Sequence, residues 1–301
     1  MYNSDVTTME ASLLINLDSR RAKSDYRELM IACRDAGVNI VKEYQVGRKS
    51  SLSATLGAIK RAAPSLLIIA AGDGTLSRAM SLLAGTKIEI GIIPLGTTNN
   101  FARSLNIPLN LTDAIKLMLT NNAQPVDLDV VGSRHFANVV GIGMSAKVAR
   151  RVSDKQKQRH GRLAYTVAGL KSLISHKPFF VTVTDKDSEL AMHFETHQVI
   201  IANGRYYAGR EIAVDARVNS KELIVFPIGG RNKLDFIIRM IDFYIGKRKE
   251  VRHASYLIAR NIKIHTDRPQ PCEVDGEVYR PTPLSFRVAS GVVNVRYRGK
   301  A

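Results

Sequence analysis

The chain lacks tryptophan, has only two cysteines and is poor in acidic residues for its length. Cys33 and Cys272 are too few for a disulfide framework and lack the paired spacing of a zinc site. We therefore expect both to be reduced thiols that pack inside the protein. Aromatic residues make up 6% of the chain and do not interleave with its basic residues, which argues against a nucleic-acid-binding module. No apolar run reaches the length of a membrane span, and Asp5 and Glu10 near the start do not fit a secretory signal. We therefore expect a cytoplasmic protein.

The scarcity of acidic residues leaves a strongly basic chain. Lys and Arg number 44 against 27 Asp and Glu, which gives a formal net charge of +17. Such a balance favours an anionic partner, whether nucleic acid, a phosphorylated substrate or a membrane surface, and does not choose among them. The 301 residues, of which 45% are hydrophobic, are enough for two cores, so we expect two domains.

The pattern of apolar residues changes near Pro125. Before it, short apolar runs alternate with helical spacing, which is typical of an α/β domain with an open, mainly parallel sheet. After it, short alternating segments with turn signals such as Asn203-Gly204 and Asp275-Gly276 predict antiparallel strands. We place an α/β domain at residues 1–125 and an antiparallel β domain at 126–284.

The stretch "LLIIAAGDGTLSRAM", Leu66 to Met80, passes from a buried strand into a helix through Gly72-Asp73-Gly74. Two glycines allow such a turn to bring its amides close to a ligand, and the phosphate-binding end of a helix follows. The alternative is a tight connection with Asp73 or Thr75 as a cap. The Lys and Ser/Thr of a P-loop are absent, which argues against that class of nucleotide enzyme.

A second turn of this kind lies in "PLGTTNNFARSLNIP", Pro94 to Pro108, again after an apolar strand. Parallel strands end at one edge of a sheet, where open α/β folds bind ligands, so the two turns predict a phosphate and ribose site. The alternative is that Asn99 and Asn100 only cap the following helix. His193 and His197 are four residues apart on a predicted strand, and we expect surface histidines rather than a metal site.

Five motifs together carry a family resemblance. They occur in this order along nearly the whole chain: "GDGTL", "PLGTTNNFARSLNIP", "HFANVVGIGMSAKVAR", "ANGRYYAGREIAV" and "EVDGE". The chain resembles the diacylglycerol kinase-like lipid kinases, which include sphingosine kinases and bacterial lipid kinases and are distantly related to NAD kinases. The resemblance implies an N-terminal domain for ATP, a C-terminal β-sandwich for the lipid, and a last strand, about 285–301, that returns to the first domain.

The resemblance also implies roles for single residues. Asp73 would be catalytic and hold magnesium, Glu277 would be the base that accepts the proton of the lipid hydroxyl, and Asp275 would lie on the metal side. The nucleotide would be bound by Asn16, Gly72, Gly74, Thr75, Gly96, Thr97 and Asn99. The implied activity is transfer of the γ-phosphate of ATP to a hydroxyl of diacylglycerol or a similar lipid, with ATP and Mg²⁺ as cofactors.

Several positions depart from the family pattern. Arg78 stands where glutamate is common, Asn100 where aspartate is usual, and Asn219-Ser220-Lys221 replaces an acidic segment that supports a structural magnesium site in some members. These changes keep open a second function, a catalytically weak regulator that binds nucleotide or anionic lipid. A soluble enzyme that phosphorylates NAD is a third, which "NNFAR" and the basic charge make less attractive.

The segment Asn232 to His253 predicts an amphipathic helix that ends in Lys247, Arg248, Lys249 and Arg252. Its apolar side either packs on the β domain or lies against a bilayer. In both cases the basic end favours an anionic membrane surface, so we expect peripheral membrane association, with a lipid substrate and no nucleic acid as partners.

Overall fold

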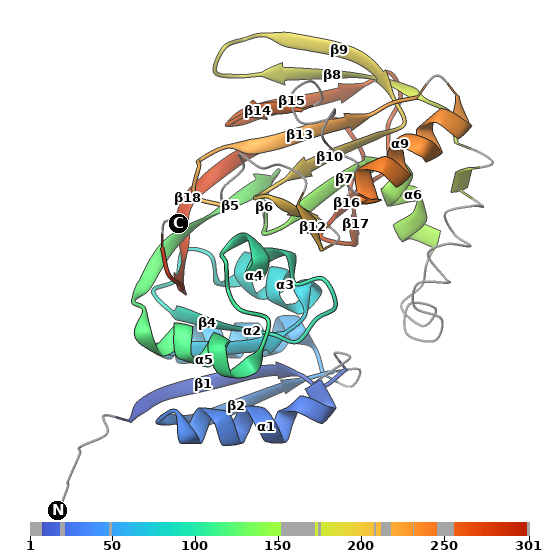
Figure 1. Cartoon of the computed structure of the whole chain (residues 1–301). Coiled ribbons are helices and arrows are strands. Elements are labelled where there is room, and N and C mark those ends of the chain that lie inside the picture. Colours follow the sequence, from blue (N-terminus) through green and yellow to red (C-terminus); the bar gives the residue numbers. More distant parts are fainter. Residues whose placement is uncertain are drawn as a thin grey trace, which may run out of the picture. The chain divides into compact units, whose positions relative to one another are not determined.

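The computed structural model folds into two compact units, residues 1–128 with 290–301 and residues 129–289 (Figure 1). We call them the α/β unit and the β unit. The structure describes residues 8–18, 22–47, 50–151, 172–173, 176–207, 209–211, 218–230, 232–245 and 256–299. The sequence also has helical spacing at residues 161–175, of which the structure describes only 172 and 173. The basic cluster of Lys247, Arg248, Lys249 and Arg252 lies outside the described residues.

The α/β unit alternates strands and helices along its first 120 residues. Its elements are β1 (Met9–Asn16), α1 (Ala22–Asp35), β2 (Val38–Val46), α2 (Leu52–Ala62), β3 (Leu66–Ala71), α3 (Asp73–Leu83), β4 (Glu89–Pro94), α4 (Asn100–Ser104) and α5 (Leu111–Thr120). Two further strands, β5 (Ala123–Val131) and β18 (Leu284–Arg296), pair with each other, and each has residues in both units.

The strands of the α/β unit form a parallel sheet in the order β2-β1-β3-β4, and the carboxyl half of β18 pairs parallel with β4. The run Leu66–Ala71 is buried at every position because both faces of the central strand are covered. Helix α1 contacts α5, and α2 contacts α3. The predicted parallel α/β fold is therefore confirmed.

Side-chain caps begin two of the helices. The Ser51 hydroxyl accepts a hydrogen bond from the Ala54 amide at the start of α2, and Asn110 accepts one from the Asp113 amide at 2.8 Å at the start of α5. Thr112, a residue type that also caps helices, lies inside α5 instead. Asn and Thr are both good caps, so local sequence alone does not choose between them.

The β unit is built mainly from antiparallel strands. Its further elements are β6 (Arg134–Phe136), β7 (Val139–Gly143), α6 (Met144–Arg151), β8 (Phe179–Asp185), β9 (Ala191–Thr196), β10 (Gln198–Ala202), β11 (Tyr206–Tyr207), β12 (Arg210–Glu211), β13 (Leu223–Ile228), α9 (Lys233–Ile245), β14 (Leu257–Ala259), β15 (Asn261–Thr266), β16 (Cys272–Val274) and β17 (Glu277–Tyr279). One sheet has the order β14-β13-β10-β7-β16-β17, and the other contains β15, β8 and β9 beside the amino-terminal half of β18.

Side chains of both sheets share one core, as in a β-sandwich. Strand β15 alternates between buried and more exposed residues because only one of its faces meets this core. Strand β10 is buried throughout: Val199 and Ile201 face the shared core, whereas Ile200 and Ala202 belong to a second cluster with Phe236 of α9 and Met144 of α6. The predicted antiparallel β-sandwich is confirmed, and the far face of one sheet carries two helices (Figure 1).

Both cysteines are free and buried, as predicted for packing residues. Burial raises the pKa of the Cys33 thiol to about 11 and also raises the pKa of Cys272. Within the part of the chain that the structure describes, no helix is both long and apolar enough to cross a bilayer.

Candidate active site

Three neighbouring parallel strands of the α/β unit end at one edge of the sheet. Their register aligns Ile15 with Ala70 and Ala71 with Pro94. The residues that follow or end these strands, Asn16, the turn 72–75 and the turn 96–100, therefore lie together. The structure thus brings together the two polar turns that the sequence pointed to.

Gly72 and Gly96 touch each other backbone to backbone. A Cβ atom on Gly96 would lie 2.7 Å from the Gly72 Cα and 2.7 Å from the Asn99 Oδ1, distances that real Cβ atoms essentially never show. A Cβ on Gly72 would lie 3.1 Å from the Gly96 Cα. These glycines are therefore needed for the contact between the two turns. The sequence alone had suggested only the close approach of a ligand as the reason for them.

Gly74 is different from these two glycines. It is exposed, and a Cβ atom built on it meets nothing within 4 Å. It lies in the first turn of α3, whose N–H groups have no intrahelical acceptor and carry the positive end of the helix dipole. This position is where the protein leaves room for an anionic group to approach the backbone.

The Asp73 carboxylate connects the two turns. Its Oδ2 accepts a hydrogen bond from the Thr98 hydroxyl at 2.6 Å, and its Oδ1 accepts one from the Asn100 amide at 2.7 Å. A carboxylate oxygen has two lone pairs, so each oxygen retains acceptor capacity beyond these bonds. Asp73 is partly exposed, which leaves it accessible at the edge of the sheet.

Two asparagines position the turns with their side chains. The Asn16 amide donates to the Thr75 hydroxyl at 2.7 Å, which links the end of β1 to the start of α3. Asn99 has a positive φ of 49° and bonds both polar groups of the Gly96 backbone, accepting from its N–H at 2.9 Å and donating to its carbonyl at 3.0 Å. Thr97, which follows Gly96 in the second turn, is exposed.

Sequence reasoning gave no individual role to two residues of this network. Thr98 supplies the hydroxyl that binds Asp73, and the Arg103 guanidinium donates to the Thr98 carbonyl at 2.9 Å. Both lie inside the motif "PLGTTNNFARSLNIP", so the motif itself marked them. Arg78, which departs from the family pattern, reaches toward α2 and donates to the Ser53 hydroxyl at 3.1 Å.

The predicted acidic residues of the β unit lie on the β16–β17 hairpin. Asp275 and Gly276 have φ values of 50° and 84°, as a two-residue turn of the predicted kind requires. The Asp275 carboxylate accepts hydrogen bonds from three consecutive backbone amides, those of residues 137, 138 and 139, at 2.8–3.1 Å. Asp275 therefore holds this loop against the hairpin, and its metal-side role stays a prediction.

Glu277 begins β17 and is half exposed. Its Oε2 accepts a hydrogen bond at 2.7 Å from the guanidinium of Arg134, which is only 20% exposed. Arg134 orients the carboxylate, although an ion pair this exposed contributes at most about 1 kcal/mol to stability. Sequence reasoning missed Arg134, because 143 residues separate it from Glu277.

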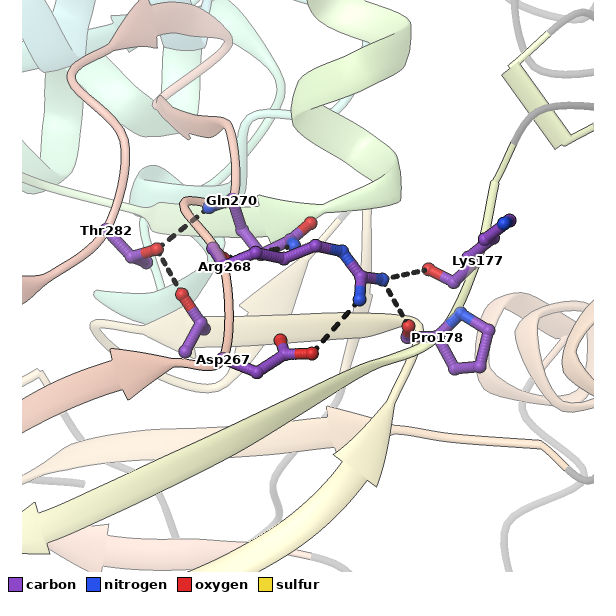
Figure 2. Close-up of polar contacts among 7 residues, drawn as sticks. Lys177, Pro178, Asp267, Arg268, Gln270 and Thr282 are labelled. Carbon is purple, nitrogen blue, oxygen red and sulfur yellow. Dashed lines mark hydrogen bonds and ion pairs between the residues drawn. The ribbon is translucent and has the colours of Figure 1, made fainter.

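Hydrogen bonds close the base of this hairpin. The backbone N–H of Gln270 donates to the Thr282 hydroxyl at 2.9 Å, and the backbone N–H of Thr282 donates back to the backbone carbonyl of Gln270 at 3.1 Å. The Arg268 guanidinium donates to the carbonyls of Lys177 and Pro178 and pairs with Asp267, as Figure 2 shows. The segment that leads into the hairpin is therefore fixed to the start of β8.

An apolar cavity of about 350 Å³ lies in the β unit, between edge strands of its two sheets. It is lined by Val183, Met192, Phe194, Val225, Pro227, Tyr256 and Leu257. These side chains come from β8, β9, β13 and β14 and the residue before β14, and they offer almost no charge. The chemistry of the lining suits a hydrocarbon group.

His197 is not the surface residue that the sequence suggested. It is 1% exposed, and its ring packs against Phe236 of α9 at 4.6 Å and His176 at 5.1 Å between centroids. Lys147 lies 3.0 Å from the His176 Nδ1. His193 is exposed, as expected, and bonds the Thr182 hydroxyl. Across the residues that the structure describes, no three His, Cys, Asp or Glu side chains group as metal ligands.

Comparison with known families decides the class of the chain. The diacylglycerol kinase catalytic domain matches residues 10–131, and the YegS C-terminal NAD kinase beta sandwich-like domain matches residues 138–297. The chain belongs to the diacylglycerol kinase-like lipid kinases. It is a kinase enzyme, and the predicted resemblance is confirmed.

Relatives of this lipid kinase family include named proteins and solved structures. A protein of Bacillus subtilis (strain 168) named diacylglycerol kinase is 28% identical over 224 residues, which are 73% of this chain and 74% of that protein. A crystal structure described as a diacylglycerol kinase from Bacillus anthracis str. Sterne superposes with a TM-score of 0.73 at 22% identity. It covers 97% of this chain and 98% of that one, which shows that the two share a fold.

Proposed function

We propose that this lipid kinase uses ATP and Mg²⁺ to transfer the γ-phosphate to a hydroxyl group of diacylglycerol or a similar lipid. Family membership supports the reaction class, and the Bacillus subtilis relative named diacylglycerol kinase supports the acceptor. The observation that carries the proposal is the hydrogen-bonded link from Asp73 to Thr98 and Asn100, because it places a carboxylate among polar turns at the ligand-binding edge of the sheet.

The nucleotide would bind at this edge. The free N–H groups of the first turn of α3 suit phosphate oxygens, and Gly74 leaves space for them. Gly72 and Gly96 contribute by holding the turns in contact, while Asn16, Thr75 and Asn99 fix them by hydrogen bonds. Thr97 is exposed at the same turn and is proposed to contact the nucleotide directly.

The residues present fit a magnesium ion bound together with phosphate. Mg²⁺ prefers one or two carboxylates, substrate phosphate oxygens and water, and Asp73 retains lone pairs for such a role. When bound, the ion would offset the negative charge of the transferring phosphoryl group. Asp275 has three N–H partners already, so it would contribute little to an ion.

Glu277 is proposed as the general base. The hydroxyl of the lipid would give its proton to the Glu277 carboxylate while its oxygen forms a bond to the γ-phosphorus. The bond from that phosphorus to the bridging oxygen breaks, and ADP leaves. The hydrogen bond from Arg134 supports this role because it fixes the orientation of the carboxylate.

The cavity of the β unit is proposed to take an acyl chain of the lipid. Its apolar lining would gain about 0.8 kcal/mol for each methylene group removed from water. A diacylglycerol resides in a bilayer, so the enzyme would work at a membrane surface, and the net charge of +17 favours an anionic one.

A second candidate function is a regulator that binds nucleotide or anionic lipid without efficient catalysis. The segment Asn219-Ser220-Lys221 favours it, because an exposed lysine with a φ of 59° stands where some family members carry acidic residues.

The test is transfer of labelled phosphate from ATP to diacylglycerol in mixed micelles, with and without Mg²⁺ and with NAD as a soluble acceptor. Magnesium-dependent label in the lipid supports the proposed kinase. Label in NAD alone would contradict it, and nucleotide binding without transfer to any lipid would favour the regulator.

A further inference from the structure

Helix α9 is apolar on two opposite sides. On its inner side, Phe236 is 2% exposed and Met240 packs against the same cluster on the sheet. On its outer side, Leu234, Ile238 and Ile241 are 66%, 49% and 47% exposed. Because their spacing is i, i+4 and i+7, these three side chains form one stripe, which we call the outer stripe.

The outer stripe is unusual for a protein surface. Single exposed aliphatic residues are normal, but contiguous ones on a rigid element mark an interface. Phe236 and Met240 pack α9 on the β unit, and among the described residues the three members of the outer stripe do not belong to that cluster. The sequence had left open whether the apolar side of this helix faces the core or a bilayer, and the structure shows apolar residues on both a packed side and an exposed side.

The charged residues of α9 are of both signs, and the cations are the more exposed. Lys233 is exposed and Arg239 is 58% exposed, whereas Asp235, which pairs with Arg239 at 3.2 Å, is 30% exposed and Asp242 is partly buried. Long basic side chains beside an apolar stripe are typical of helices that lie in the plane of a membrane interface. A second copy of this chain is a poorer occupant, because each copy carries +17 and the two would repel each other.

We propose that α9 binds the surface of an anionic bilayer with its outer stripe inserted at the boundary between headgroups and acyl chains. The inference rests on the proposed lipid kinase function, which places the substrate in a membrane. It adds the surface through which the enzyme reaches that substrate. The attachment combines apolar insertion with attraction to anionic lipid, so both salt and mutation of the stripe should weaken it.

The absence of tryptophan makes a direct test available. Ile238→Trp gives the protein a single tryptophan on the outer stripe, and Ile31→Trp gives it one on α1 at a matched exposure of 51% against 49%. With vesicles of phosphatidylcholine and phosphatidylglycerol, we expect the emission of the first variant to shift to the blue and to be quenched by brominated lipid. The second variant should show neither change, and pure phosphatidylcholine should affect both weakly.

Vesicle sedimentation without ATP tests whether removing apolar side chains from the outer stripe weakens binding. The double change Leu234→Asn with Ile238→Asn should lower affinity for anionic vesicles at least about tenfold, whereas Ile31→Asn should leave it unchanged. Unchanged binding by the double variant, or an emission shift that follows protein concentration instead of lipid, would overturn the inference and point to another surface or to a second copy. Because neither readout requires turnover, stripe-dependent binding by an inactive enzyme would leave the inference standing while the proposed function fails.

Discussion

Asp73 accepts the backbone amide of Asn100 at 2.7 Å, so the first residue of α3 is tied to the first residue of α4. The same carboxylate accepts the Thr98 hydroxyl. This gives Asp73 two functions: it joins the two turns and it presents a negative charge at the edge of the sheet. A useful mutation has to separate them.

Asp73→Asn makes this separation. The asparagine keeps one oxygen for the Asn100 amide, and its new NH₂ group can donate to the Thr98 hydroxyl, which rotates to accept. We expect the unfolding transition to stay close to wild type while lipid phosphorylation falls by about two orders of magnitude or more. Asp113→Asn, in the first turn of α5, is the matched control and should stay active. Near wild-type turnover by the folded Asp73→Asn enzyme would contradict the proposed role.

Gly74→Ala tests the open space at the start of α3. No protein atom lies within 4 Å of the added methyl group, and alanine is a better helix former, so we expect stability to rise by up to about 1 kcal/mol. If phosphate approaches the backbone here, nucleotide affinity should fall at the same time. Calorimetric titration with an ATP analogue, together with thermal unfolding, measures both. Unchanged affinity would place the phosphates elsewhere.

Glu277→Gln should lower the rate at saturation by roughly two to four powers of ten, the range for a positioned general base, and leave nucleotide affinity unchanged. Glu195→Gln, an exposed strand residue of the same unit, is the control. A Glu277→Gln enzyme that keeps its rate but loses affinity for ATP would show that Glu277 is a binding residue and that the proposed base is another group.

The sequence predicted the α/β fold well because its signals are local. Apolar runs such as Leu66–Ala71 and the helical spacing between them depend on neighbouring residues alone. The pairing of the β unit is not local: β10 pairs with β7 and β13, so the Asn203-Gly204 signal does not join two paired strands, whereas Asp275-Gly276 does.

The candidate site likewise has features that local sequence predicts and contacts that only the pairing of distant strands creates. The turns around Asp73 and Gly96 were predicted, but the contact of Gly72 with Gly96 depends on the register of β3 with β4, which no local pattern encodes. The link between Arg134 and Glu277 likewise depends on a hairpin formed far along the chain.

Narrowing the apolar cavity should change the preference among lipids. Leu257 lines the cavity and Ile258, its neighbour on β14, points to the other side and is 41% exposed. We expect Leu257→Phe to lower kcat/KM for a long-chain diacylglycerol about tenfold more than for dioctanoylglycerol, since the methylene groups that lose the cavity are absent from the short chain. Ile258→Phe should leave the ratio unchanged. Equal losses on both substrates would show that the cavity does not hold the acyl chain.

The buried histidines predict how stability depends on pH. His176 is fully buried, and its Nδ1 accepts a hydrogen bond from Lys147, so the neutral ring carries its proton on Nε2. Burial, reinforced by the charge of Lys147, lowers the pKa of His176 to about 4, and burial also lowers the pKa of His197.

The sign follows from proton binding. Between about pH 6.5 and pH 4 the unfolded chain binds a proton at His176 that the folded chain does not, so the free energy of unfolding falls as the pH falls through this window. His176 alone accounts for a loss of up to about 3 kcal/mol, and above pH 7 its contribution is constant. Urea unfolding at pH 7.5, 6 and 5 measures the slope of the free energy of unfolding against pH. His176→Gln keeps an acceptor for Lys147 without a titrating ring and should flatten it, whereas His193→Gln, at an exposed site, should not. An unchanged slope in His176→Gln would assign the acid sensitivity to other groups.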